Sequence, residues 1–479
     1  MNTPIDMRFL LLLVLMLGLL SCSSGNEEQS RQTSLPTLPE EVNWSTHIAP
    51  ILYRACVVCH RPNQVAPFSL LDYEGAAVRA KLISAVTQSR YMPPWPADAN
   101  YSHFLEERVL SEYDIALLAK WAETGAQAGN LSQAPAPPIG ETDGWLGKAD
   151  WVVQLDQPVR IPGNNREHFW IVKVPFELPF DTFVRAVEFV PGHKRLVHHM
   201  NGHLIRYPNS SPKDVFAGLR KVDPSLLGYE TTYELLGLLE SNGQHPPLVP
   251  SVVNYLPGMQ PVVYPQGIGG WSFTRKGVFL FRDIHYGASP VDTFDQPELH
   301  IYFMPEAPKR PTKEMMLGTN GLSRIDPPLV IPPGTISRHK TAYVLTQDIS
   351  VLTINPHMHL LGKEFWAYAI LPAGDTVPII RIPQWDFRWQ YNYTFPKMLH
   401  LPGGSRIEVW GSFDNMAENP NNPHHPPIEV REPAGNMRST DEMFQLIITY
   451  LPYKAGDEHI SLDLKKDTRD SKNSFSENQ

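Results

Sequence analysis

The sequence contains few cysteines, few long apolar runs and no excess of positive charge. Its 479 residues include three cysteines, so at most one disulfide can form, and a disulfide-rich scaffold is excluded. The formal net charge is −9. Because no basic field is available to meet phosphates, we expect no nucleic-acid partner. In contrast, prolines are abundant, at 47, which favours loop-rich β structure over long helices.

The only long apolar run, Phe9–Leu20, lies near the N-terminus and is too short to span a bilayer. It is typical of a secretory signal, and the Leu19–Cys22 stretch at its end resembles a bacterial lipobox. An ordinary signal peptide with an incidental cysteine is the alternative. We therefore predict a signal peptide over 1–21, lipidation of Cys22, and a protein anchored on the periplasmic side of a bacterial membrane. Ser23 gives no inner-membrane retention signal, which favours the outer membrane.

The composition divides the rest of the chain into segments. We predict a flexible tether over 22–39, a compact domain over 40–130, a proline-rich linker over 131–150, and a disordered charged tail over 456–479. Between 151 and 455, short alternating runs such as TFVRAVEFV are separated by proline and glycine. This pattern is typical of β-sandwiches.

The compact segment contains the motif C-x-x-C-H, formed by Cys56, Cys59 and His60. Two cysteines at this spacing would also suit a redox disulfide or half of a zinc site. The histidine directly after them favours covalent attachment of a c-type haem, with two thioether bonds and an axial imidazole.

The surrounding segment, 40–130, resembles a small class I cytochrome c domain, which implies an all-α fold. One helix is expected to lead into the motif, and another is expected over the stretch LSEYDIALLAKWAETGA. Met92, on a proline-stiffened loop, is the predicted sixth iron ligand, with His103 or His47 as alternatives. Ligation by histidine and methionine would make this domain an electron carrier.

Further histidines occur in three stretches of the β region: His198 and His199 in LVHHMNGHL, His285 in FRDIHYGAS, and His357 and His359 in INPHMHLLGKEF. On a strand, His357 and His359 point to the same face and can share one metal ion. A thioether such as Met443 as third ligand would favour copper. Adjacent His198 and His199 face opposite sides of a regular strand, so both can bind one ion only if the backbone bends or one ring reaches around.

In this order, the segments His198-His199-Met200, His285-Tyr286-Gly287, His357-x-His359-x-x-Gly362 and Asp441-Glu442-Met443 resemble the copper type II, ascorbate-dependent monooxygenases. That family includes peptidylglycine α-hydroxylating monooxygenase and dopamine β-monooxygenase. The resemblance implies two all-β, jelly-roll-like sandwiches, 151–315 and 316–455. It implies an electron-transfer copper on His198, His199 and His285, and an oxygen-binding copper on His357, His359 and Met443. It implies no catalytic residue beyond these ligands.

The chain departs from the family at several positions. No cysteine lies between 151 and 455, whereas the animal enzymes are rich in disulfides. Asn355 stands where the peptide-hydroxylating enzyme has an arginine that grips the substrate carboxylate, and Ile447 stands where it has the assisting tyrosine. These departures argue against a peptide substrate of the amidation type.

The remaining histidines match no ligand position. We expect His203 to be structural. The polar loop that contains Asp414, Asn415 and Asn419 is either a cleft rim or a connection stabilised by Asx turns, and we favour the turns. His424 and His425, later in that loop, are expected to be solvated.

These features predict a multidomain copper-dependent monooxygenase that hydroxylates a C–H bond of an unknown organic substrate with O2. Electrons would come from a periplasmic donor through the fused haem, because a tethered carrier raises its own effective concentration and could replace or supplement ascorbate. Two alternatives are a non-catalytic copper and haem redox lipoprotein, and a copper-dependent oxidase or dehydrogenase that passes electrons to the haem.

Overall fold

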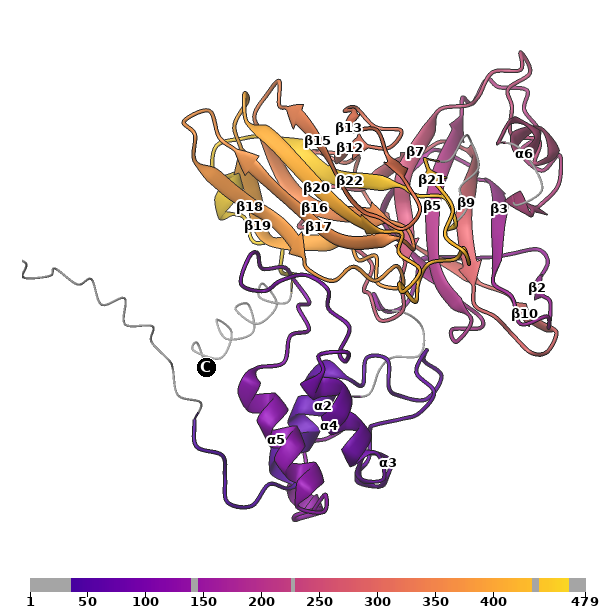
Figure 1. Cartoon of the computed structure of the whole chain (residues 1–479). Coiled ribbons are helices and arrows are strands. Elements are labelled where there is room, and N and C mark those ends of the chain that lie inside the picture. The colour runs from indigo at the N-terminus through magenta and orange to yellow at the C-terminus, as the bar shows by residue number, and fades with distance from the viewer. Residues whose placement is uncertain (1–35, 139–144, 225–228, 433–438, 465–479) are drawn as a thin grey trace, which may run out of the picture. The chain divides into compact units, whose positions relative to one another are not determined.

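The computed structural model describes residues 36–138, 145–224, 229–432 and 439–464 (Figure 1). The signal peptide and Cys22 lie outside these ranges, as does the tether up to residue 35, so the expectations for them stay predictions. Within the described ranges, no helix is both long and apolar enough to cross a membrane.

Helices dominate the segment before the β region. They are η1 (Trp44–Ile48), α2 (Ala49–Ala55), α3 (Tyr73–Ala77), α4 (Ala80–Gln88), α5 (Glu112–Glu123) and η2 (Leu131–Gln133). Both helices that the sequence predicts are present. Helix α2 ends directly before Cys56, and α5 begins after Ser111. The Ser111 hydroxyl accepts from the Asp114 N–H, and the Asp114 carboxylate accepts from the Ser111 N–H, which is a capping box.

The first part of the β region, 151–304, is a sandwich of two main sheets (Figure 1). One sheet has the order β6 (Lys221–Val222), β3 (His168–Glu177), β9 (Lys276–Tyr286), β5 (Val197–Tyr207) and β7 (Leu248–Tyr255). The other has the order β1 (Trp151–Gln154), β11 (Glu298–Met304), β4 (Thr182–Val190) and β8 (Trp271–Phe273). A small ribbon pairs β2 (Val159–Ile161) with β10 (Thr293–Asp295), and α6 (Tyr229–Leu235) lies between β6 and β7 in the chain. Val174 and Phe281 of one sheet and Val184 and Leu299 of the other share one hydrophobic core.

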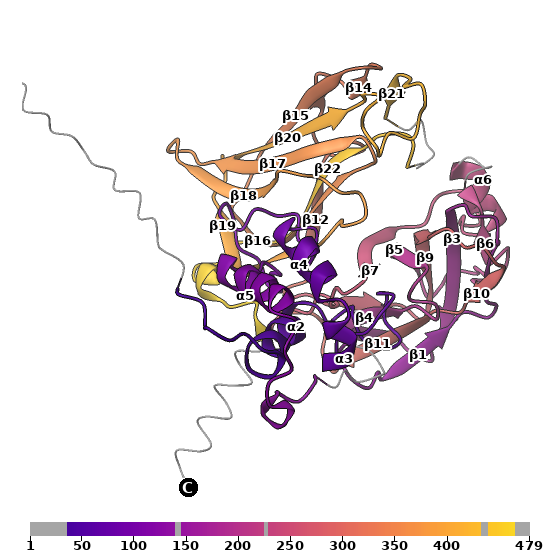
Figure 2. The ribbon, with the colours of Figure 1, turned by 60° about the horizontal axis from the view of Figure 1, so that its bottom comes forward.

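A second sandwich follows, with its two layers visible in Figure 2. One sheet has the order β13 (Ile325–Asp326), β15 (Ile336–Val344), β20 (Arg406–Asp414), β17 (Gly362–Ile370) and β18 (Thr376–Ile382). The other has the order β12 (Lys313–Gly318), β22 (Phe444–Pro452), β16 (Ile349–Met358) and β19 (Tyr393–Leu401), and β14 (Val330–Ile331) pairs with β21 (Val430–Arg431). The core contains Phe365 and Val409 from one sheet and Ile354 and Leu446 from the other. Because β12 pairs with β22, this sandwich begins a few residues before the predicted boundary at 316.

The predicted disordered tail begins too early in the chain. Residues 456–464 are folded and contain η4 (Asp457–His459). The buried Asp457 carboxylate accepts two hydrogen bonds from Arg310, at 2.6 and 2.7 Å, and one from the Ser350 hydroxyl at 2.6 Å. Leu462 is also buried. The prediction is wrong for this stretch because the charged composition conceals an ion pair with a distant residue.

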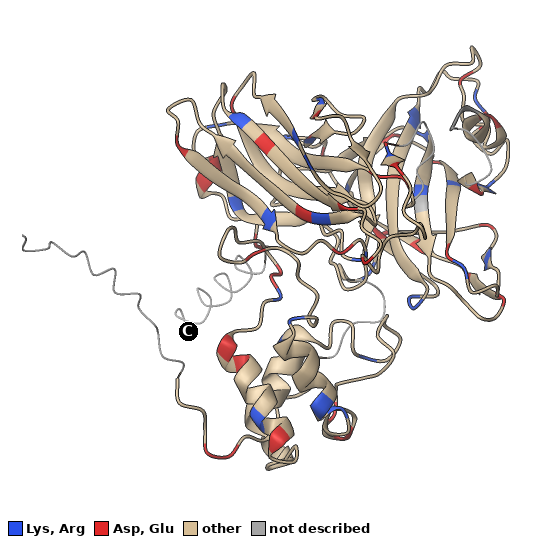
Figure 3. Ribbon diagram, in the orientation of Figure 1, with Lys and Arg blue, Asp and Glu red and all other residues tan. Residues whose placement is uncertain are grey.

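The segment between α4 and α5 contacts the second sandwich. The Asp98 N–H donates to the Arg381 carbonyl at 2.8 Å, and the Leu105 N–H donates to the Thr394 carbonyl at 2.8 Å. Phe104 is part of the hydrophobic core of that sandwich. Figure 3 shows basic and acidic residues interspersed along the strands rather than gathered by sign.

Candidate metal centres and the adjoining cavity

A β-bulge brings the first three histidines together. The register of β5 and β9 pairs Val197 with Tyr286 and His199 with His285, which leaves His198 as an extra residue in β5. The ring centroids of His198 and His199 lie 4.7 and 5.0 Å from that of His285. The bulge therefore supplies the backbone bend that two adjacent histidines need to act at one site.

Glu167, which belongs to no sequence motif, joins this cluster. Its Oε2 lies 3.2 Å from His285 Nε2, and donor atoms of Glu167, His198 and His285 all lie within 4.8 Å of one another. Glu167 directly precedes β3, the strand that pairs with β9 and sets Phe169 opposite His285. A single acidic residue before a strand is not a recognisable sequence motif. Glu167 meets His285 only because β3 pairs with β9.

Gly287 makes room for the His198 ring. A Cβ at this position would lie 2.6 Å from His198 Nε2, so a larger residue would displace the imidazole. The His285 ring is 3% exposed and stacks on Phe169 at a centroid distance of 4.2 Å. The cluster is therefore fixed by close packing on two sides.

Burial and neighbouring charges set the protonation of this cluster. Burial, with a smaller contribution from His285, lowers the pKa of His198 to about 4. A hydrogen bond from His285 lowers the pKa of Glu167 below its usual value. At neutral pH the His198 imidazole is thus neutral and the Glu167 carboxylate ionised, which are the forms that bind metal.

The second cluster forms at the end of β16. His357 is on this strand, His359 follows it, and their ring centroids are 5.0 Å apart. The register of β16 and β22 pairs His357 with Gln445 and Met358 with Phe444. Met443, whose side chain is buried, directly precedes β22, as His359 directly follows β16. The structure thus brings the two rings together, as strand alternation predicts, and places Met443 next to the end of the strand that pairs with β16.

The segment before β22 holds His359 in place. His359 Nδ1 donates to the Asp441 carbonyl at 3.0 Å, and its backbone N–H donates to Glu442 Oε2 at 2.9 Å. The indole of Trp385 donates to the His359 carbonyl at 3.2 Å. With the proton on Nδ1, the lone pair suited to a metal is on Nε2.

Replacement of Glu442 should destabilise this support. Glu442 is fully buried, and its two carboxyl oxygens accept from the His359 and Leu361 N–H groups, at 2.9 and 2.6 Å. The amide of Glu442→Gln has only one acceptor oxygen, so one of these N–H groups would lose its partner, at about 1–3 kcal/mol. We expect a loss of this size in the free energy of unfolding of the metal-free protein, measured with urea. The exposed control Glu418→Gln should stay within about 0.5 kcal/mol of wild type. Equal stability of the two variants would contradict this role of Glu442.

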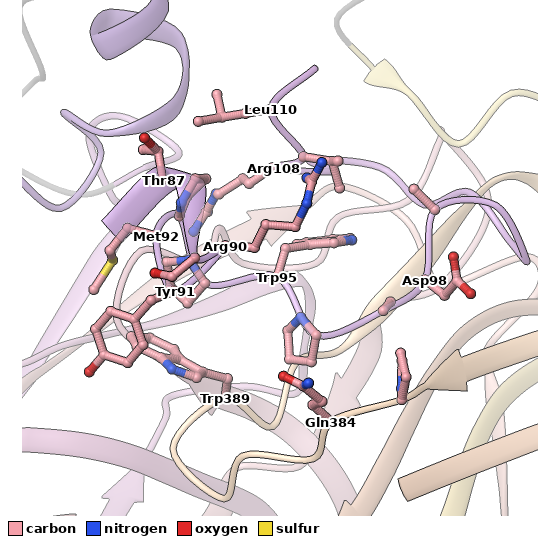
Figure 4. Close-up of a pocket in the computed structure, with 18 of the residues that line it drawn as sticks. Thr87, Arg90, Tyr91, Met92, Trp95, Asp98, Arg108, Leu110, Gln384 and Trp389 are labelled. Atoms are coloured by element: carbon pink, nitrogen blue, oxygen red, sulfur yellow. The ribbon is translucent and has the colours of Figure 1, made fainter. Parts of the chain in front are cut away.

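A cavity of about 1160 Å³ adjoins Met92. Met92 and Tyr91 line it from one side and Gln384 and Trp389 from another (Figure 4). Neither alternative sixth ligand, His47 or His103, lines this cavity. The His103 side chain is 74% exposed and pairs with Glu107. Cys56, Cys59 and His60 do not line it either, so Met92 stays the predicted sixth ligand on the sequence argument.

The motif cysteines do not line the cavity, but Cys59 lies close to one residue that does. Cys56 and Cys59 are not bonded to each other, and burial raises the pKa of Cys56 to about 12. A Cβ at Gly258 would lie 2.7 Å from Cys59 Sγ and 3.1 Å from a guanidinium nitrogen of Arg108. Because Arg108 also lines the cavity, Cys59 and the cavity share a neighbour.

His60 is oriented by its own loop. Its Nδ1 donates to the Phe68 carbonyl at 3.2 Å, and its ring packs on Phe68 at a centroid distance of 4.7 Å. Burial lowers the pKa of His60. A neutral imidazole with Nδ1 engaged presents Nε2 as its ligating nitrogen.

His203 lies outside both clusters. Its Nδ1 accepts a hydrogen bond from the Ser251 N–H at 3.2 Å. Burial lowers its pKa to about 3. This environment is the structural one that the sequence suggests.

The polar loop after β20 is built from turns. The fully buried Asn415 donates to the carbonyls of Ile331, Pro332 and Ile428, at 3.0, 3.1 and 2.7 Å. Asp414 accepts from the Met416 N–H at 3.1 Å, as in an Asx turn. His425 is exposed, whereas His424 is half-buried. The expectation that both histidines are solvated is therefore wrong for His424.

Comparisons with known proteins add little. No family model matches the sequence, and no curated protein matches it. Among solved structures, that of PNGF-II is similar over 63% of this chain, with 11% identity and a TM-score of 0.22. The match covers 65% of PNGF-II, which is less than two thirds of its length. Similarity at this level gives no information about function.

Proposed function

We propose that this chain is a copper-dependent monooxygenase that hydroxylates a C–H bond of an organic substrate with O2 and has its own c-type haem. The observation that carries the proposal is the presence of two histidine clusters on two sandwiches, with the bulge at His198 completing the first. Separate donor sets suit two one-electron metal centres. The proposal includes the finer fold, a cytochrome c domain followed by two jelly-roll-like sandwiches.

The donor atoms of both clusters fit copper. Three imidazoles with a nearby carboxylate would form the first set. Two imidazoles, those of His357 and His359, would form the second with the thioether of Met443. The soft thioether of Met443 favours Cu(I). Bound copper would supply one-electron transfer at the first set and O2 activation at the second. The chain's own contribution is orientation, since Asp441 and Glu442 fix the tautomer and position of His359.

The residues around C-x-x-C-H fit a c-type haem. Both thiols lack a disulfide, and His60 is oriented through Nδ1, which leaves Nε2 as the ligating nitrogen. Met92 lines a large cavity, which Arg108, a neighbour of Cys59, also lines. Bound haem would supply electrons one at a time. Arg90 and Arg108 also line this cavity, so the chain offers positive charge to the carboxylates of the macrocycle.

One observation favours a second candidate. Two histidines with a glutamate, as in the group Glu167, His198 and His285, are also the donor set of hydrolytic zinc sites. The protein would then be a hydrolase whose haem domain serves another purpose.

Metal analysis of the purified full-length protein tests the proposal. Elemental analysis should give two coppers and one iron per chain, and mass spectrometry should give one covalent haem. A single copper, or zinc in equal amount to the chain, would contradict the two-copper proposal.

The proposed setting is periplasmic. The chain would be anchored through lipidated Cys22, accept electrons from a periplasmic donor, and take O2 and an organic substrate as its partners. These statements rest on the sequence alone.

A further inference from the structure

The segment Pro383–Tyr391, which connects β18 to β19, is held by several hydrogen bonds. Asn355 Nδ2 donates to the carbonyls of Gln390 and Tyr391, at 3.2 and 3.0 Å. The buried Trp385 donates from its indole to the His359 carbonyl. Asn355 is two residues from His357 on β16, so the strand that carries the second cluster also anchors this segment.

A tight turn fixes the middle of the segment. The Trp389 N–H donates to the Asp386 carbonyl at 2.9 Å, and the Gln390 amide donates to the Phe387 carbonyl at 2.8 Å. Arg388 pairs with Asp386 at 2.5 Å and donates to the Tyr91 hydroxyl at 3.3 Å. Tyr91 precedes Met92, and both line the cavity described above, so the turn also contacts the wall of that cavity (Figure 4).

Phe387, in the middle of this turn, contacts both clusters. Its ring centroid lies 6.0 Å from that of His199 and 6.4 Å from that of His285 in the first cluster. It lies 5.5 Å from the centroid of His359 in the second. One aromatic ring therefore contacts histidines from two different sandwiches. The distance between the ring centroids of His199 and His359 is at most the sum of their two distances to the Phe387 centroid.

We propose that Phe387 is a positioning residue that fixes the separation between the two metal clusters. Its ring donates no ligand. It keeps His199 and His285 at a set distance from His359, because the turn that holds it is anchored to β16 and to Tyr91. The proposal rests on the proposed function, since it requires metal in both clusters. In the peptide-hydroxylating enzyme that the sequence resembles, an arginine stands at the position of Asn355 and binds the substrate carboxylate. In this chain, Asn355 anchors the turn instead.

Electron paramagnetic resonance of the protein loaded with Cu(II) at both clusters tests this role. The magnetic coupling between two Cu(II) ions falls steeply with distance, so the intensity of the half-field transition reports their separation without any turnover. Phe387→Ala removes the ring and leaves space for the clusters to approach or separate, and we expect about a twofold or greater change in this intensity. Phe387→Tyr retains the ring and should keep the wild-type intensity. The matched control is Phe180→Ala, which removes an exposed phenylalanine ring outside both clusters and the cavity and should leave the intensity unchanged.

Each outcome has one meaning. Copper content should stay at two per chain in every variant, because no ligand is removed. If Phe387→Ala retains the wild-type intensity with both coppers bound, the positioning role is wrong and the proposed function stands. If Phe387→Ala loses copper, the ring supports ligation rather than spacing, and the proposal is also overturned. If the wild-type protein cannot be loaded with two coppers, the proposed function itself fails.

Discussion

Replacement of His285 with alanine is expected to remove one of two coppers and to abolish turnover while leaving the haem in place. The His285 ring lies against both His198 and His199 and within 3.2 Å of Glu167, so every other donor of the first cluster contacts it. Changes to supporting residues alone typically cost about 10–100-fold in metal affinity or activity, and loss of a direct ligand should cost more. Elemental analysis and product formation measure the two effects.

The matched control is His203→Ala. His203 is on the same strand as His198 and is also desolvated, but it contacts the Ser251 backbone and belongs to neither cluster. This variant should lose some stability and retain both coppers. If His285→Ala keeps two coppers, or if His203→Ala loses one, the assignment of the first cluster is wrong.

The double substitution Cys56→Ala/Cys59→Ala should eliminate covalent haem. No thioether bond can form without the two thiols, so the denatured protein should lack haem in both its mass and its absorption spectrum. The coppers should remain at two per chain, because neither cysteine belongs to a histidine cluster. Turnover with the physiological donor should collapse, since the tethered carrier is lost.

Cys22→Ala is the control for this result. It removes the other cysteine of the chain, and the protein should keep its haem while leaving the membrane fraction. If the double variant retains covalent haem, the attachment site is elsewhere. Retention of the Cys22 variant in membranes would contradict the lipid anchor.

Local patterns predict much of this fold. The stretch LSEYDIALLAKWAETGA predicts α5, and the short alternating runs predict the β-sandwich region. The meeting of the His357 and His359 rings also follows from alternation alone. These features depend on residues close in sequence, which is why sequence reasoning finds them.

Features that depend on pairing between distant segments were not predictable. The bulge at His198 arises from the register with β9, and Glu167 reaches His285 only through pairing of β3 with β9. Phe387 has no motif, because its position depends on a turn anchored to another strand. The fold of residues 456–464 depends in the same way on the ion pair between Asp457 and Arg310. In each case, the sequence supplies the residue types, and long-range pairing determines which of them meet.

The central claim is that electrons pass from the haem to the copper sites and that one oxygen atom enters the substrate. Its most direct test is anaerobic chemical reduction of the full-length protein, followed by addition of ¹⁸O2 with candidate substrates. The account predicts a hydroxylated product with one ¹⁸O atom, and haem reoxidation that is fast only when both O2 and substrate are present. If substrate instead reduces the haem without oxygen, and the product contains no ¹⁸O, electrons run in the opposite direction and the protein is not a monooxygenase.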